Sequence, residues 1–233
     1  MCMLDTKYMP IAPLKQFVHA ILATDIVIFT IQNGQLKVLL IKMTRQPYVN
    51  MWAIPGGLIT PDESADEAAL RHLRAKTNVK DVYLEQLYTF GRVDRDPRGR
   101  VVSVAYFALI PSTNVSLKTT ADYAGIDWFP IKKLPSLAYD HSEIISRAID
   151  RLKSKLAYST ISYSLLSKEF TLSELQSVYE VILGRKLDKR NFRKKILSLG
   201  LIRATGKKRR GTANRPAELY TFKKRIPEFV DIL

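Results

Sequence analysis

The first two thirds of the chain alternate between short apolar runs and polar turns. Asp25 to Thr30 and Leu36 to Met43 have the composition of strands, and the Asn33-Gly34 dipeptide between them is typical of a tight hairpin turn. Apolar runs of similar length predict three further strands, at 82–89, 101–110 and 126–130.

Two helices are predicted around these strands. Ser64, followed three residues later by Glu67, forms a capping box, so a helix is expected to begin there. Helical spacing places Ala65, Ala69, Leu70 and Leu73 on its buried side. A second helix is expected to open at Asp140-His141 and to run to about Leu156. Mixed strands with helices on both sides predict an α/β/α sandwich.

The last third of the chain has a different pattern. Thr171 and Glu174 make a second capping box, Gly184 closes that helix, and Asp188 suits the start of another, which buries Phe192 and Ile196. Two strands, at 201–204 and 218–222, flank a basic turn bounded by glycines. Two capped helices followed by a basic hairpin predict a winged helix-turn-helix.

The junction between these two regions is expected at Ala157 to Thr160, read as a hinge, with a short amphipathic segment after it at 161–168. We therefore expect one domain over residues 1–157 and a second over residues 158–233.

Charge is unevenly distributed between these regions. The net charge is +15, and residues 161–233 carry 17 Lys/Arg against 7 Asp/Glu, a net +10. A basic excess of this size on a segment patterned like a folded domain favours an anionic partner such as DNA over a merely solubilising tail.

The cysteine content and the hydropathy of the chain argue against disulfide-bonded, zinc-binding and membrane proteins. Cys2 is the single cysteine, which excludes a disulfide framework and a cysteine zinc site and suits a reducing cytoplasm. The apolar run from Phe17 to Ile31 contains His19 and Asp25 and is too short to span a bilayer comfortably. It also lacks a signal-peptide cleavage pattern, so we expect a helix or loop leading into a strand and no membrane partner.

The candidate chemistry begins in the stretch from Pro55 to Val79, a loop that runs into the first helix. Gly56 and Gly57 allow the backbone to approach a ligand closely. The stretch resembles a Nudix box, with the required residue types at Gly57, Glu63, Arg71, Leu73 and Val79.

The resemblance fails where the Nudix family binds metal. The family's metal-binding glutamates would fall at His72, Ala75 and Lys76, and Asn78 replaces the last glycine. These three helix positions share one face, where carboxylates would hold magnesium against a pyrophosphate. A lysine places a positive charge there instead. We expect a Nudix fold without metal-assisted hydrolysis, and no bound metal or cofactor.

A second candidate element is the arginine-rich loop at 91–100. Arg95, Arg98 and Arg100 suit phosphate or carboxylate recognition, although a solvated hairpin turn is the plainer interpretation. This string also resembles Nudix proteins that handle ADP-ribose-like ligands. His141 is expected either to position a ligand or to bond at the start of its helix. Trp52 and Tyr88 are possible stacking partners, or simply core residues.

The whole chain resembles the NrtR family of Nudix-related transcriptional regulators. The resemblance rests on the damaged box, the string from Arg95 to Arg100, and the segments from Leu187 to Lys195 and from Arg215 to Phe222. It implies a homodimeric bacterial repressor of NAD-metabolism genes, with ADP-ribose or a related metabolite as effector. Some relatives control sugar catabolism instead, so a sugar effector stays open.

The candidate site residues form two sets. Those expected to bind the effector, with the cations replacing the metal, are Arg45, Gly56, Gly57, Arg71, Lys76, Arg95, Asp96, Arg98 and His141. Those expected to contact a pseudo-palindromic double-stranded DNA operator are Lys189, Arg190, Asn191, Arg193, Lys194, Lys207, Lys208, Arg209, Arg210 and Arg215.

Two alternative functions stay open at this point. A Nudix hydrolase with a basic nucleic-acid-binding appendage would need Glu63, Asp66 and Glu67 to hold a metal in a displaced geometry. An RNA-binding protein is less favoured, because the sequence has no obvious platform of paired aromatic residues.

Overall fold

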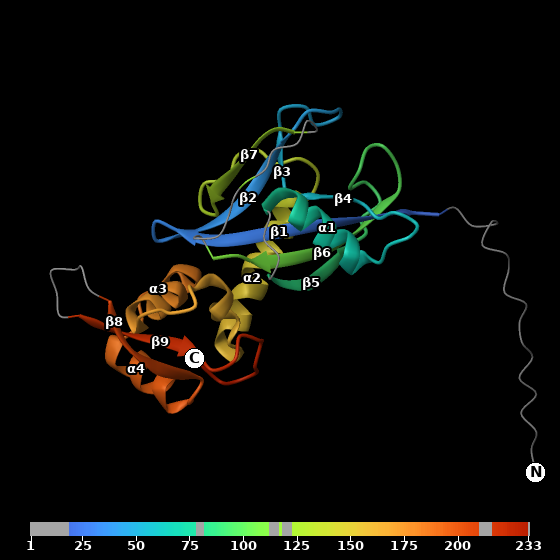
Figure 1. Ribbon diagram of the computed structural model, residues 1–233. Coiled ribbons are helices and arrows are strands. Elements are labelled where there is room, and N and C mark those ends of the chain that lie inside the picture. Colours follow the sequence, from blue (N-terminus) through green and yellow to red (C-terminus); the bar gives the residue numbers. More distant parts are fainter. Residues whose placement is uncertain (1–18, 78–81, 112–116, 118–122, 210–215, 233) are drawn as a thin grey trace, which may run out of the picture.

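The computed structural model describes residues 19–77, 82–111, 117, 123–209 and 216–232. A sheet with helices on its faces forms the larger part of the protein, and a smaller unit of helices with a two-stranded hairpin lies beside it (Figure 1). Among the described residues, no helix is long and apolar enough to cross a membrane.

The large sheet is mixed, as the sequence predicts. Its main path has the order β3-β2-β1-β6-β5, with β4 paired to β1 and β7 paired to β2. Strands β1 and β6 run parallel, and the other pairs are antiparallel. The strands are β1 (Ile21–Gln32), β2 (Gln35–Met43), β3 (Trp52–Ala53), β4 (Gly56–Leu58), β5 (Tyr83–Phe90), β6 (Val101–Leu109) and β7 (Tyr123–Pro130).

Helices cover both faces of this sheet, because β1 is apolar on both sides. Ile26 and Ile28 pack with Leu73 of α1 (Ala65–Thr77) on one face. Val27 and Phe29, whose side chains alternate with them, join the core of α2 (His141–Tyr158) on the other. The predicted α/β/α sandwich is therefore confirmed.

The first hairpin follows its turn chemistry. Asn33 and Gly34 both have positive φ, 52° and 69°, which is the conformation that a two-residue hairpin turn needs. Strand β1 is longer than predicted and begins at Ile21, because its first residues pair with Val101 at the start of β6. Long-range pairing therefore makes a strand where a helix or loop was expected.

The smaller unit comprises η3 (Ile161–Leu165), α3 (Leu172–Leu183), α4 (Lys189–Ser198), β8 (Ile202–Arg209) and β9 (Ala217–Phe222). Both predicted helix starts are confirmed: Thr171 and Glu174 form a complete capping box, and the Asp188 side chain accepts a hydrogen bond from the Asn191 N–H. Gly184 closes α3 with φ of 70°. Residues 161–166 are all buried, so the expected amphipathic segment is instead part of the core.

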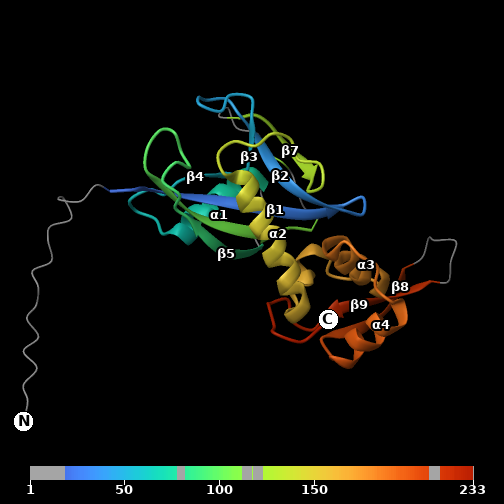
Figure 2. The ribbon, with the colours of Figure 1, turned by 180° about the vertical axis from the view of Figure 1, so that it is seen from behind.

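The predicted hinge at Ala157 to Thr160 is packed. Helix α2 continues to Tyr158, and the Thr160 N–H donates to the Glu228 carbonyl at 3.0 Å. The C-terminal segment folds back onto this junction, where the Ile232 N–H donates to the Ala157 carbonyl at 2.8 Å. Figure 2 shows α2 running from the sheet into the smaller unit.

We expect the buried end of α2 to stabilise both units together. Leu156 is fully buried in a core that includes Ile161 and Tyr179. Replacing Leu156 by Ala should lower the free energy of unfolding by about 2–5 kcal/mol, because the lost methyl groups leave a cavity. Urea denaturation followed by circular dichroism measures this. The exposed Lys153→Ala change on the same helix serves as the control. Equal effects of the two changes would contradict the shared core.

Candidate ligand pocket and nucleic-acid interface

A cavity of about 280 Å³ lies where the damaged box, the arginine loop and the start of α2 meet. Its lining includes Gly56 and Gly57 from β4, Arg95, Asp96 and Arg98 from the loop, and Arg45 and His141. Seven of the nine predicted effector-binding residues thus line one cavity; Arg71 and Lys76 do not.

The floor of this cavity is a buried ionic network. Arg95 donates to both carboxylate oxygens of Asp140, at 2.9 and 2.8 Å, and to Asp25 at 3.0 Å. Ser103 donates to Asp25 at 2.6 Å, and the His141 Nε2 lies 3.5 Å from the same carboxylate. Arg95 lines the cavity while it pairs with two carboxylates of this chain, and its predicted contact with an effector stays a prediction.

The network keeps Asp25 ionised. Burial alone would raise the pKa of Asp25, but the contacts of its carboxylate with His141, Ser103 and Arg95 lower that pKa to about 2. His141 is fixed in turn, because its Nδ1 accepts a hydrogen bond from the Ile54 N–H at 3.2 Å. His141 therefore has the helix-start bonding role while it also lines the cavity.

The rim of the cavity carries an exposed cation. Arg98 pairs with Asp96 at 2.7 Å, and its side chain keeps 58% of its surface accessible while that of Asp96 keeps 4%. Its guanidinium lies 5.7 Å from the ring centre of Tyr139. Arg98 thus has the geometry for contacting an anion above the cavity.

Among the lining residues that the sequence did not predict, three have aromatic or charged side chains. Tyr123 and Tyr139 supply aromatic surface, and Asp25 supplies the network's second carboxylate. A charged residue inside the apolar run that became β1 was the signal for Asp25. Trp52 packs against Phe129 and Tyr88 lies under Arg147, so neither lines the cavity.

The box residues pack the helix against the loop. A Cβ on Gly57 would lie 2.5 Å from Cε1 of His72, so the ring occupies the space that the glycine leaves. Arg71 donates to Glu63 at 2.8 Å and to the Leu58 carbonyl at 3.2 Å. The hydrogen bond from Arg71 to the Glu63 carboxylate, together with one from Thr60, lowers the pKa of Glu63 to about 2. Arg71 therefore ties α1 to the loop and does not reach the cavity.

His72 and Lys76 stand at two of the positions where the Nudix family has metal ligands, and both side chains pack against neighbouring residues. Burial and the nearby Arg71 lower the pKa of His72, so its ring is neutral at pH 7. Lys76 is buried on α1, where its ammonium lies 3.8 Å from the ring centre of Tyr123. Lys76 is not among the residues that line the cavity, although Tyr123 is, so the predicted contact of Lys76 with an effector stays a prediction. Within the described part of the chain, no cluster of three His, Cys, Asp or Glu could hold a metal ion.

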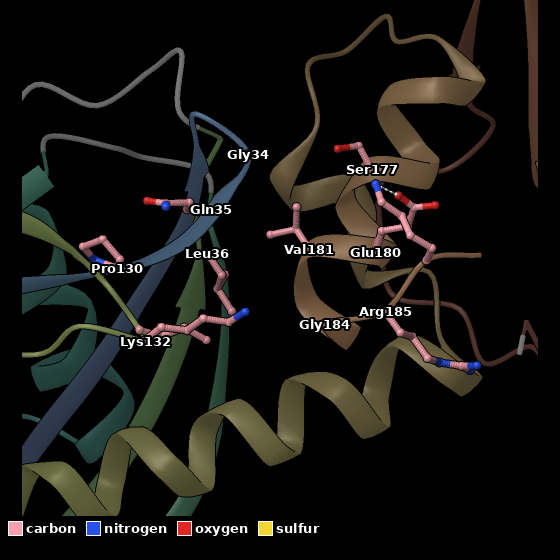
Figure 3. Close-up of a pocket in the computed structure, with 12 residues that line it drawn as sticks. Gly34, Gln35, Leu36, Pro130, Lys132, Ser177, Glu180, Val181, Gly184 and Arg185 are labelled. Carbon is pink, nitrogen blue, oxygen red and sulfur yellow. Dashed lines mark hydrogen bonds and ion pairs between the residues drawn. The ribbon is translucent and has the colours of Figure 1, made fainter.

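A second cavity, of about 530 Å³, separates the two units (Figure 3). Leu36 and Lys132 of the sheet unit lie across it from Val181 of α3 and from Gly184, which follows that helix. None of the predicted site residues lines this gap.

The exposed side of α4 forms the candidate nucleic-acid interface. Lys189, Arg190, Asn191 and Lys194 are exposed on it, and its first turn contains no acidic residue. Cations beside a helix N-terminus oppose the helix dipole, so their placement suits an external anion. Arg193 differs from the prediction, because it is half-buried and donates to the Ser173 hydroxyl at 3.0 Å.

The described part of the candidate wing before residue 210 is strand. Lys207, Lys208 and Arg209 lie within β8. Lys207 pairs with Glu169 at 2.8 Å, and Arg209 pairs with Glu174 at the start of α3. Arg210 and Arg215, also predicted to contact DNA, lie outside the described residues.

The mixed sheet with its glycine loop and box helix, joined to two capped helices and a basic hairpin, defines a Nudix-type protein with a winged helix. Residues 22–151 match the NUDIX domain model, and residues 162–222 match the NrtR DNA-binding winged helix domain. The chain therefore belongs to the NrtR family of Nudix-related transcriptional regulators.

Individual relatives agree with this assignment. The ADPR responsive transcriptional repressor NtrR of Acinetobacter baylyi is 35% identical over 206 residues, covering 87% of this chain and 82% of the relative. The crystal structure of Shewanella oneidensis NrtR with a 27mer DNA is 39% identical, with a TM-score of 0.78, over 87% of this chain and 93% of that one. The NUDIX domain of that protein with ADP ribose is 38% identical, with a TM-score of 0.53, over 63% and 94%.

The buried network predicts unequal roles for two arginines of one loop. Replacing Arg95 by Met leaves Asp25 and Asp140 buried without their cation, which should lower the free energy of unfolding by about 3–5 kcal/mol. Replacing Arg92 by Met breaks an exposed ion pair with Asp94 and should change the free energy of unfolding by less than about 1 kcal/mol. Urea denaturation at pH 7 gives both values. A loss below 1 kcal/mol for Arg95→Met would refute the structural role assigned to the network.

Proposed function

We propose that this protein is an ADP-ribose-responsive transcriptional repressor that binds operator DNA through its winged helix. The proposal rests mainly on one observation. A cavity with an exposed arginine on its rim opens beside a Nudix box without metal ligands, and α2 joins that cavity to a basic winged helix. The relatives named above are the reason for proposing ADP-ribose as the effector and DNA as the partner.

The residues at the box do not fit the hard cation of Nudix hydrolases. Magnesium wants oxygen ligands, and the three family positions hold His72, Ala75 and Lys76. The His72 ring packs against Gly57, and Lys76 adds a buried positive charge on the same helix. We therefore propose that the protein binds its nucleotide without hydrolysing it.

In this proposal the cavity recognises the effector by charge and shape. Arg98 and Arg45 also line the cavity, and they would contact a pyrophosphate there. Tyr139 and Tyr123 provide aromatic surface for the ribose or the base. Arg95 and Asp25 hold the floor in place without contacting the phosphates.

Two such chains would form a homodimer on a pseudo-palindromic operator, each placing α4 in a major groove. An effector changes operator affinity only if it prefers one arrangement of the two winged helices over the other. Ligand binding at the cavity would then change operator affinity by changing the spacing of the two recognition helices.

A gel shift on the DNA upstream of the protein's own gene, with and without ADP-ribose, tests this function. We expect the operator complex to change with ADP-ribose and not with free ribose or glucose. A parallel incubation with magnesium should leave ADP-ribose intact by chromatography. Steady release of AMP would instead identify the hydrolase alternative, and a response to sugar alone would identify a sugar-controlled regulator.

The basic winged helix also predicts a steep salt dependence. Raising salt from about 50 to 200 mM should weaken DNA binding about 10³-fold or more if six or more phosphates are contacted. Lys208 is exposed in β8 without an ion pair among the described residues, so Lys208→Ala should lower the slope by about 1. Fluorescence anisotropy measures this, with the exposed Lys133→Ala of the sheet unit as control. Identical slopes for both variants would argue against a wing on phosphates.

A further inference from the structure

Tyr139 has an unusual backbone conformation at the junction of cavity and helix. Its φ is +53°, in the left-handed region that a bulky residue rarely adopts. Both neighbours fix it there: the Ala138 N–H donates to the Trp52 carbonyl at 2.8 Å, and Arg95 holds the Asp140 carboxylate. Such a conformation persists only where the surroundings over-determine it, and it concentrates at ligand clamps and switches.

The Tyr139 ring forms part of the cavity wall. It packs edge-on against Tyr48 at 4.4 Å and lies 5.1 Å from the His141 ring, with Arg98 on its other side at 5.7 Å. A ligand that contacts Arg98 therefore lies next to this ring. The ring and the first turn of α2 are separated by a single residue, Asp140.

Helix α2 leads directly from this point to the DNA-binding unit. Its 18 residues span about 27 Å. Its C-terminal half is held at β5, where Arg151 and Lys155 both pair with Glu85, at 3.1 and 2.6 Å. At its far end, the Tyr158 carbonyl accepts from the Val230 N–H of the C-terminal segment at 2.9 Å. A displacement of the first turn therefore tilts the helix about Glu85 and moves the winged helix.

The space for that movement is present. The gap of about 530 Å³ lies between the two units, with Leu36 and Lys132 on one side and Val181 and Gly184 on the other (Figure 3). A tilt of α2 would narrow or widen this gap.

Building on the proposed function, we propose that Tyr139 is the positioning residue that couples effector occupancy to DNA affinity. The bound nucleotide displaces the ring of Tyr139, whose backbone is strained, and Asp140 passes that displacement to α2. Tyr139 contacts the ligand and also acts through α2, so its removal should abolish the coupling between the two binding sites even where each ligand still binds.

The test is a thermodynamic cycle on the full-length protein with ADP-ribose and the upstream DNA. The coupling factor is the ratio of the DNA Kd with saturating ADP-ribose to the DNA Kd without it, and a typical value is about 5–150-fold in either direction. Tyr139→Gly removes the ring and tolerates positive φ, so it should bring the factor to within about twofold of unity. Its DNA affinity without effector should stay within about threefold of the wild type.

Two matched variants separate coupling from packing. Tyr139→Phe keeps the ring and should keep the wild-type factor. Tyr88→Ala removes an aromatic contact with Arg147 of α2 outside the cavity, and it should also keep the factor. If Tyr139→Gly does not fold, judged by circular dichroism, Tyr139→Asn replaces it, because asparagine tolerates the left-handed conformation.

A wild-type coupling factor in Tyr139→Gly would overturn the proposal, as would an equal loss in Tyr88→Ala. Weaker ADP-ribose binding with an unchanged factor at saturation would also overturn it, by making Tyr139 a contact only. A wild-type protein that binds both ligands without coupling refutes this inference alone, whereas one that binds no ADP-ribose refutes the proposed function as well.

Discussion

The structure depends on one buried arginine placed between two carboxylates. Arg95 comes from the loop after β5, Asp25 from the first strand of the sheet and Asp140 from the residue before α2, so their ion pairs join three distant parts of the chain. Taking these charges out of water is costly, and the arrangement is favourable only with all partners present. The same ion pairs fix the cavity floor, the arginine loop and the start of the helix that leads to the winged helix.

In the proposed function, the Nudix box keeps its shape while packed side chains stand where the family resemblance places metal ligands. Arg71 and Glu63 still join the helix to the glycine loop. His72 fills the space above Gly57, and Lys76 is buried against Tyr123. Packing in place of metal ligation suits the proposed function, because a sensor must release its ligand unchanged and transmit occupancy through protein contacts.

The sequence predicted whatever depends on local chemistry. Asn33-Gly34, the capping box at Thr171 and the cap at Asp188 each act within a few residues, and each lies where expected. Partners far apart in sequence were not predictable. Whether Arg95 faces a ligand or Asp25 and Asp140 depends on contacts 70 and 45 residues away. The packed junction after α2 depends in the same way on a returning C-terminal segment, and the left-handed Tyr139 on bonds made by both of its neighbours.

Calorimetry distinguishes nucleotide binding without metal from metal-dependent binding. ADP-ribose is titrated into the full-length protein in EDTA and again in millimolar magnesium, with the ligand recovered and analysed afterwards. We expect the same dissociation constant in both buffers and full recovery of intact ADP-ribose. Binding that requires magnesium, or recovery of AMP and ribose phosphate, would contradict this expectation.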